Sequence, residues 1–401
     1  MPMIDICRLL GKQQLALSLL SASAAKTMSS PLPSTHSALI QDTYAQPLSL
    51  QTLPTPLATP GSAVIRVLYA PVLSYFKDVF NGTRAYPYPT PLVPGPSAVG
   101  RIAALGADTT ALRVNQLVYI DSLVRSRDGP ADMFLLGLMQ GMTTGSAKLM
   151  KDMWRNGTYA EYCCVPIENV YALNEETLVG EIGYKEQEFA GLDRYLVPYG
   201  GLRDIVLSVG ETIMITPATG AFGSGAIAVA LAMGAGKVIA TGRNQVTLAS
   251  LAAHFGSRVA TVAMTGNVEK DTAALISAAG GPIDAAFEIS PPAAAGSSHI
   301  VSTIRSLRYG GRISLMGGIQ QDYPIPLREL MSRDLKLRGK FMYSRADIRS
   351  LIRLVETGRL EIGERNGVTI AETFALKDWE EAFECAEREA SGWNKGVLLR
   401  C

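Results

Sequence analysis

The stretch ETIMITPATGAFGSGAIAVALAMGAGKVIATGRN, residues 211–244, decides the fold of this chain. An apolar, β-favouring run leads into three closely spaced glycines, Gly220, Gly223 and Gly225, which are followed by a helix-length segment and a second strand-like run. Strand, glycine turn, helix and strand in this order predict a parallel β-α-β unit. Glycines let a backbone approach phosphate groups closely, and a helix N-terminus offers them free N–H groups. We therefore expect a dinucleotide at this turn, with a tight turn that binds no ligand as the alternative.

The alternation of strands and helices continues outward from this unit. The candidate strands are residues 211–217, 237–242, 258–264, 283–290, 311–318 and 335–342. Helix-length segments such as 245–256 and 267–281 lie between most of them. Six strands joined by helical crossovers predict an α/β fold with a doubly wound parallel sheet over residues 200–344.

The rest of the chain has a different texture. Short apolar runs broken by proline and glycine, at 45–66 and 93–120, predict an irregular β-rich domain over residues 36–199. A methionine-rich interruption at 130–158 is interpreted as core packing, with a substrate pocket or a subunit contact as alternatives. The end of the chain, 345–401, is predicted to form helix, strand, helix and strand and to pack back on the first domain.

Composition limits the classes of function. The 401 residues include 37 basic and 36 acidic side chains with no notable basic run, which gives little support to nucleic-acid binding. The sequence has no long uninterrupted apolar stretch, so we predict no membrane span. Five cysteines without a CxxC pair are typical of reduced thiols in an intracellular protein. We expect a cytoplasmic protein whose residues 1–35 form a disordered leader, with organelle targeting by residues 1–27 as the alternative.

The end of the second strand indicates which dinucleotide binds. NAD sites usually carry an acid there that accepts hydrogen bonds from the ribose, but this strand ends in Gly242, Arg243 and Asn244. A guanidinium at this point suits the additional phosphate of NADP(H), although Arg243 as a solvated surface residue is the alternative. The residues expected to bind the cofactor are Thr219, Gly220, Ala221, Phe222, Gly223, Gly242, Arg243, Asn244, Ile289, Ser290, Gly317 and Lys395.

This order of parts resembles the medium-chain dehydrogenase/reductase superfamily over residues 36–401. Beside the glycine stretch, the resemblance lies in YPTPLVPGPSAVGRI (88–102), GTYAEYCCVP (157–166), LVPYGGL (196–202), RYGGRISLMGG (308–318) and NKGVLL (394–399). It implies a GroES-like catalytic domain, a Rossmann domain and a homodimer. The form ATGAFGSGA is closer to the quinone and enoyl reductases of the family than to its alcohol dehydrogenases.

The same resemblance implies that the chain holds no catalytic zinc. The alcohol dehydrogenases of the family bind zinc through a Cys, a His–Glu pair and a third Cys or acid. The matching positions here are Tyr75, Pro96, Ser97 and Asp193. A single candidate ligand, Asp193, does not suffice for Zn²⁺, which takes at least three ligands from the protein.

Without a metal, the resemblance points to an NADPH-dependent reductase of a small α,β-unsaturated carbonyl compound or quinone. Tyr75 and Lys77 are then expected beside the nicotinamide, with Lys77 as proton donor and Asp78 or Asp193 balancing its charge. A structural ion pair of Lys77 is the alternative. Tyr86 and Tyr88 are further candidates for the catalytic tyrosine, and Asp193 is also expected among the catalytic residues. Two other functions stay open: a metal-free carbonyl reductase or alcohol dehydrogenase, and an NADPH-binding protein without turnover.

Overall fold

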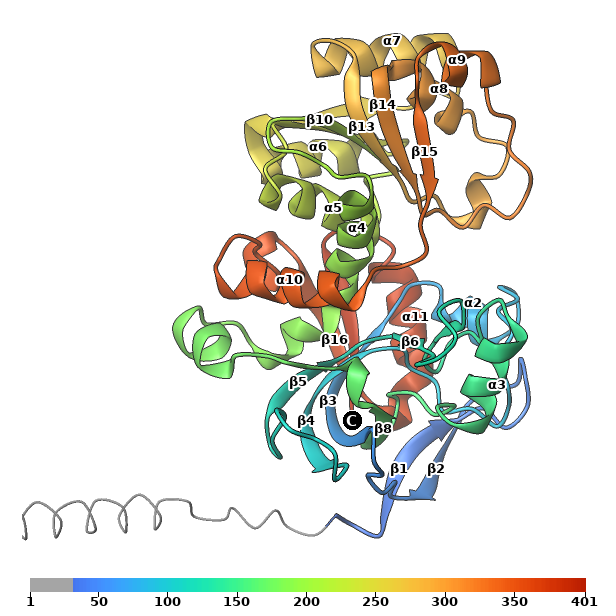
Figure 1. Cartoon of the computed structure of the whole chain (residues 1–401), viewed down its shortest axis with the longest axis vertical. Coiled ribbons are helices and arrows are strands. Elements are labelled where there is room, and N and C mark those ends of the chain that lie inside the picture. The colour runs from blue at the N-terminus through green and yellow to red at the C-terminus, as the bar shows by residue number, and fades with distance from the viewer. Residues whose placement is uncertain (1–31) are drawn as a thin grey trace, which may run out of the picture. The chain divides into compact units, whose positions relative to one another are not determined.

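This computed structural model describes residues 32–401. Their two large β-sheets differ in construction (Figure 1). Most of the leader expected at residues 1–35 lies outside the described residues. Its predicted end was wrong, because strand β1 already begins at Thr35 and pairs with β2. Among residues 32–401, no helix is both long enough and apolar enough to cross a membrane.

The nucleotide-binding type of sheet predicted from residues 211–244 is present. It has six parallel strands in the order β12-β11-β10-β13-β14-β15. The strands are β10 (Thr212–Thr216), β11 (Lys237–Gly242), β12 (Val259–Ala263), β13 (Ile283–Glu288), β14 (Leu307–Leu315) and β15 (Lys336–Gly339). The helices between them are α5 (Ala221–Ala232), α6 (Gln245–Phe255), α7 (Val268–Ala279), α8 (His299–Ser306) and α9 (Leu327–Ser332). The predicted doubly wound parallel sheet is thus confirmed.

The central strands of this sheet, β10, β11 and β13, are almost entirely buried, whereas the edge strand β15 is mostly exposed. Along β10, Ile213 and Ile215 belong to one hydrophobic core, whereas Met214 between them belongs to another. This follows from the strand period of two, which sends successive side chains to opposite faces. Parallel strands covered by helices on both sides therefore show continuous apolar runs such as IMI rather than alternation with polar residues.

The second sheet forms the β-rich domain. Its strands follow the order β16-β17-β3-β4-β5-β9, and β8 also pairs with β3. The strands are β3 (Ser62–Val72), β4 (Ala98–Leu105), β5 (Leu117–Ile120), β8 (Tyr162–Pro166), β9 (Val170–Ala172), β16 (Thr369–Ala375) and β17 (Lys395–Arg400). Two small antiparallel pairs, β1 (Thr35–Ile40) with β2 (Ser49–Pro54) and β6 (Leu123–Arg125) with β7 (Met133–Leu135), accompany it. The helices beside this sheet are α2 (Phe76–Phe80), α3 (Thr144–Asp152), α10 (Arg345–Glu356) and α11 (Trp379–Glu389).

The end of the chain completes the β-rich sheet. β17 pairs antiparallel with β3, so residues distant in sequence become neighbours, as Val397 opposite Val72. The sequence gives the physical reason: KGVLL supplies an apolar strand whose Val397 and Leu399 enter the same core as β3.

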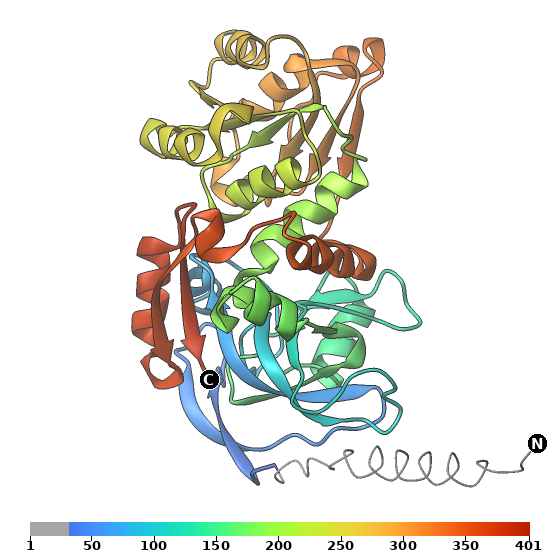
Figure 2. The same ribbon diagram turned by 90° about the vertical axis from the view of Figure 1, so that its left-hand side faces the viewer.

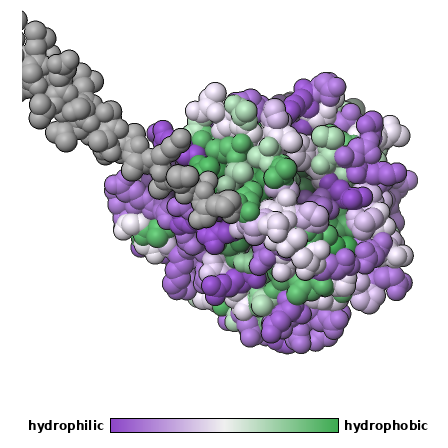
Figure 3. Space-filling view, turned by 90° about the horizontal axis from the view of Figure 1, so that it is seen from below, coloured by the Kyte–Doolittle hydropathy of each residue, from purple (hydrophilic) through white to green (hydrophobic). Residues whose placement is uncertain are grey.

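In the space-filling view from below, hydrophobic residues form several separate groups among hydrophilic ones on this part of the molecule (Figure 3).

Helix α4 (Asp193–Asp204) joins the two sheets (Figure 2). It packs against α5, and the two helices come so close that a Cβ on Gly225 of α5 would collide with the backbone oxygen of Arg194 in α4. Gly225 is therefore required for helix packing rather than for ligand binding. The boundary expected at residues 199 and 200 falls inside α4, which begins at Asp193 and continues without a break through both residues.

Candidate active site

The glycine turn before α5 has the shape of a phosphate cradle. Gly220 is the residue preceding the helix, and a Cβ added to it would meet no atom within 4 Å. Gly223 is different, because its Cβ would collide with the carbonyl oxygen of Pro217. Gly223 lets the helix sit tightly on the strand, and Gly220 leaves open space in front of the helix N-terminus, where a phosphate is favoured.

The next strand ends at the predicted ribose position. A Cβ on Gly242 would lie 2.5 Å from Cγ2 of Thr219, so this glycine allows β11 to pass close to the turn. Arg243 is exposed and has no ion-pair partner among residues 32–401. Asn244 caps α6, where its side chain accepts a hydrogen bond of 3.1 Å from the N–H of Thr247. The open space before α5 fits the phosphates of a dinucleotide, and the exposed Arg243 follows the neighbouring strand.

The carboxyl ends of β13 and β14 supply Ile289, Ser290 and Gly317, around a buried polar cluster. Ser290 Oγ lies 2.8 Å from Nε2 of His299, and Glu288 Oε1 lies 3.3 Å from the same nitrogen. The N–H of Gly317 donates to Glu288 at 3.2 Å. Burial by itself raises the pKa of Glu288, but hydrogen bonds from His299 and Ser290 outweigh it and hold the pKa below its usual range. Sequence reasoning missed His299, which lies on the following helix and carries no motif.

A small cavity of about 60 Å³ joins the two domains near the glycine turn. Phe222 and Lys395 line it together with Asp193. Arg194 fixes the neighbouring segment, because its Nη2 donates to the backbone oxygen of Lys395 at 2.7 Å. Ala221, at the start of α5, lines the same cavity as Lys395. Lys395 therefore lies close to the N-terminal end of α5.

Asp193 is the buried acid of this site. It is 6% exposed, and burial raises its pKa to about 6, although the Arg194 guanidinium and the Arg194 N–H, which donates at 2.9 Å, oppose the rise. Tyr119 lies close enough to Asp193 for its own pKa, already raised by burial, to be raised further. The buried hydroxyls of Tyr119 and Ser97 make no hydrogen bond of full geometry within residues 32–401, although Ser97 and Tyr343 lie near enough to Tyr119 to oppose the rise of its pKa. Unsatisfied hydroxyls beside a buried acid are typical of a site that binds a polar ligand.

Tyr75 faces the same acid from the start of α2. Burial raises its pKa, Tyr86 and Asp193 raise it further, and Arg84 opposes them. The Arg84 guanidinium carbon lies 4.1 Å from the centre of the Tyr75 ring and 4.9 Å from that of Tyr86. Sequence reasoning missed Arg84. The feature of the sequence that could have indicated Arg84 is that it is the only charged residue between Asp78 and Arg101.

Two expectations about α2 and the loop after it are corrected. Lys77 is paired neither with Asp78 nor with Asp193; its Nζ lies 3.0 Å from Glu387 Oε2 on α11, because the short helix turns this side chain outward. Tyr88 is 7% exposed, and its hydroxyl donates to Gln41 at 2.7 Å. Tyr88 is therefore part of the core of the β-rich domain, whereas Tyr86 remains beside Arg84.

The positions that correspond to zinc ligands offer few metal-binding groups. Asp193 lies near enough to Tyr75 to raise the pKa of its phenol, and Ser97 is buried. Across residues 32–401, no group of three or more His, Cys, Asp or Glu side chains is placed to hold a metal ion. The four cysteines in that range, Cys163, Cys164, Cys385 and Cys401, are free thiols.

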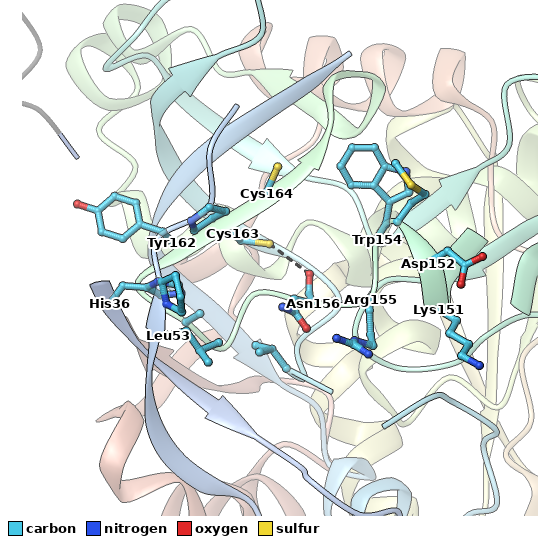
Figure 4. Close-up of a pocket in the computed structure, with 16 residues that line it drawn as sticks. His36, Leu53, Lys151, Asp152, Trp154, Arg155, Asn156, Tyr162, Cys163 and Cys164 are labelled. Atoms are coloured by element: carbon cyan, nitrogen blue, oxygen red, sulfur yellow. Dashed lines mark hydrogen bonds between the residues drawn. The ribbon is translucent and has the colours of Figure 1, made fainter. Parts of the chain in front are cut away.

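A larger cavity of about 260 Å³ lies elsewhere in the β-rich domain (Figure 4). His36 and Tyr162 line one side and Trp154 another, and Cys163 Sγ donates to the backbone oxygen of Asn156 at 3.6 Å. None of the predicted site residues lines this cavity. We therefore place the candidate active site at the junction of the domains, where the acid, the phenols and the glycine turn meet.

Two family models match the chain. The alcohol dehydrogenase GroES-like domain matches residues 59–175, and the zinc-binding dehydrogenase domain matches residues 221–357. Two curated relatives, both named L-threonine 3-dehydrogenase, come from Anaeromyxobacter dehalogenans and Saccharopolyspora erythraea. The first is 25% identical over 313 residues, 76% of this chain and 81% of the relative. The second is 27% identical over 313 residues, 75% of this chain and 82% of the relative.

Solved structures share the fold. A thermostable alcohol dehydrogenase from Pyrobaculum aerophilum superimposes with a TM-score of 0.68 at 21% identity, covering 92% of this chain and 100% of that one. An NADP-bound zinc-binding dehydrogenase from Sinorhizobium meliloti gives a TM-score of 0.72 at 18% identity with the same coverage. The two family models together span more than half of the chain, in the same order as the two domains. The chain therefore belongs to the medium-chain dehydrogenase/reductase superfamily.

Proposed function

We propose that this protein is an NADPH-dependent, zinc-independent reductase of a small molecule in which a carbon–carbon double bond is conjugated to a carbonyl group, or of a quinone. One observation carries the proposal: the place of the zinc ligands is taken by Tyr75, Ser97 and Asp193. These side chains offer hydroxyl and carboxyl groups, which suit hydrogen bonding to an oxygen better than metal binding.

The cofactor supplies a hydride to the substrate when it is bound. Negative charge then develops on the carbonyl oxygen of the substrate, and hydrogen-bond donors fixed in place stabilise that charge. Tyr75 keeps its proton at neutral pH because its pKa is raised. Asp193, with a pKa of about 6, retains its proton in part of the molecules near neutral pH and so is able to donate it.

The cofactor preference rests on Arg243. It follows the second strand of the nucleotide-binding sheet, is exposed, and stands where an acid would repel the additional phosphate of NADPH. Gly242 before it keeps the backbone close to the glycine turn. These features support NADPH over NADH.

A second candidate function is the oxidation of a secondary alcohol, or the reverse reduction of a ketone. It is favoured by the curated relatives, which are named L-threonine 3-dehydrogenases. This chemistry requires a base that accepts the hydroxyl proton, and ionised Asp193 is the candidate.

NADPH absorbance followed against a panel of enones, quinones and ketones tests the proposal. The reverse reaction is assayed with NADP⁺ or NAD⁺ and L-threonine or simple secondary alcohols. We expect turnover with the enones or quinones and NADPH. Turnover with ketones and alcohols alone would favour the second candidate. NADPH binding without turnover of any substrate would point to a binding protein.

A further inference from the structure

Arg84 is held in an unusual setting at the candidate active site. Its guanidinium lies against the rings of both Tyr75 and Tyr86, with carbon-to-centroid distances of 4.1 and 4.9 Å. Contacts between a guanidinium and aromatic faces restrict the plane of the group. The backbone N–H of Arg84 donates to the carbonyl of Asp78 at 2.7 Å, which ties the loop to α2. The guanidinium is thus held in position rather than free to sample solvent.

Nothing among residues 32–401 balances this charge. No ion pair in that range includes Arg84. Its Nε is buried and makes no hydrogen bond, although the residue as a whole is half-buried. A buried donor without a partner in the chain calls for a partner outside it, such as a water molecule, an ion or a ligand.

Arg84 also faces the nucleotide-binding domain. A Cβ on Gly318 would lie 3.8 Å from Nη2 of Arg84, and Pro292 is the other neighbour of that glycine. Gly318 follows β14 and Pro292 follows β13, so both mark the carboxyl edge of the parallel sheet. Ligands of doubly wound sheets bind outside this edge. Arg84 therefore reaches across the junction toward the part of the site where the substrate meets the cofactor.

We propose that Arg84 binds a carboxylate group of the substrate. This inference rests on the proposed function and narrows its substrate class to unsaturated keto acids. A planar guanidinium pairs with a carboxylate through two parallel hydrogen bonds, and the Nη2 atom of Arg84 lies on the side of Gly318. The bound carboxylate fixes the neighbouring double bond beside Tyr75, which donates to the carbonyl oxygen. Binding involves no covalent step and consumes no further reactant.

The test compares acetylacrylate with its methyl ester, which differ in the carboxylate and share the reactive enone. We expect the wild-type enzyme to prefer the acid in kcat/KM. Arg84→Met should reduce the acid-to-ester preference by about 10- to 150-fold, the range for losing a hydrogen bond to a charged group. Arg84→Lys keeps the positive charge but loses the planar guanidinium that makes two parallel hydrogen bonds. Its acid-to-ester preference should lie between those of the wild type and Arg84→Met. Arg66→Met is the matched control, because Arg66 is exposed in β3 and its substitution should leave the preference unchanged.

A binding measurement separates this inference from the proposed function. Calorimetric titration with levulinate and methyl levulinate, in the presence of NADP⁺, needs no turnover. Tighter binding of levulinate to the wild type than to Arg84→Met supports the inference even if no enone is reduced. Equal affinities for acid and ester in the wild type would overturn it. A loss of NADPH affinity in Arg84→Met, measured by nicotinamide fluorescence, with an unchanged acid-to-ester ratio would also overturn it and assign Arg84 to a cofactor phosphate.

Discussion

Lys77 of α2 and Glu387 of α11 form an ion pair of 3.0 Å, which connects the first helix of the β-rich domain to a helix more than 300 residues later in the chain. The side chains are 42% and 55% exposed. The acids that raise the pKa of Lys77 are Glu387, Glu384 and Asp78, and Asp193, the buried acid of the site, is not among them. The pair therefore favours a structural role for Lys77 over the catalytic role expected from its position in the sequence.

We accordingly predict that Lys77→Met changes kcat by less than about twofold, whereas loss of a general acid typically costs about 100-fold or more. The stability change should be small, because exposed ion pairs contribute little. Glu387→Gln, which breaks the same pair from the other side, is the matched control and should behave alike. A large loss of kcat in Lys77→Met alone would restore Lys77 as the proton donor.

Asp193 should make stability depend on pH. Its pKa rises from 3.8 in the unfolded chain to about 6 in the folded protein, so below about pH 4 both states are protonated and the group contributes nothing. As pH rises from about 4 to 6, the unfolded state releases the proton first, and the folded state loses up to about 3 kcal/mol. Above about pH 6 the penalty is complete.

Asp193→Asn removes this titration. Denaturant unfolding between pH 4.5 and 7.5 should show that the variant gains stability relative to the wild type as pH rises, by up to about 3 kcal/mol. Asp322→Asn, at an exposed position, is the control and should run parallel to the wild type. Parallel pH profiles for wild type and Asp193→Asn would mean that Asp193 has an ordinary pKa.

Arg243 should discriminate between the two nicotinamide cofactors. A charge-assisted hydrogen bond to the additional phosphate is worth about 1.5–3 kcal/mol, or about 10- to 150-fold in affinity. Arg243→Ala should weaken NADPH by that factor and leave NADH nearly unchanged, as measured by nicotinamide fluorescence. Arg258→Ala, also exposed in the nucleotide-binding domain, is the control. Equal losses for both cofactors, or a wild type that prefers NADH, would show that Arg243 does not recognise the phosphate.

Metal removal should have no effect on activity. By the family resemblance, Tyr75, Pro96 and Ser97 stand where the alcohol dehydrogenases carry zinc ligands, and residues 32–401 contain no cluster of three or more candidate ligands. We expect dialysis against a chelator to leave kcat unchanged and elemental analysis to find no stoichiometric zinc. About one zinc per chain, together with loss of activity on its removal, would contradict the zinc-independent mechanism.

The sequence alone determined the nucleotide-binding half of the fold. The six strands predicted between residues 211 and 342 all occur. The central ones are buried on both faces and need continuous apolar runs, and glycines such as Gly223 mark the turns where helices and strands pass closely. The family resemblance also followed from local motifs. Local pattern was sufficient wherever the constraint acts between residues near one another in the chain.

Only the tertiary structure decided which side chains meet at the site. Lys77 and Tyr88 lie within a few residues of Tyr75 and Tyr86 in sequence, yet contacts with Glu387 and Gln41 direct them elsewhere. Arg84 stands out in sequence only as an isolated charge, and its place against two tyrosine rings and opposite Gly318 depends on how the two domains pack. Asp193 likewise acquires its raised pKa from burial at that junction. Burial and long-range contacts arise only once the chain has folded, so a side chain's partner and charge state are properties of the folded molecule rather than of its motif.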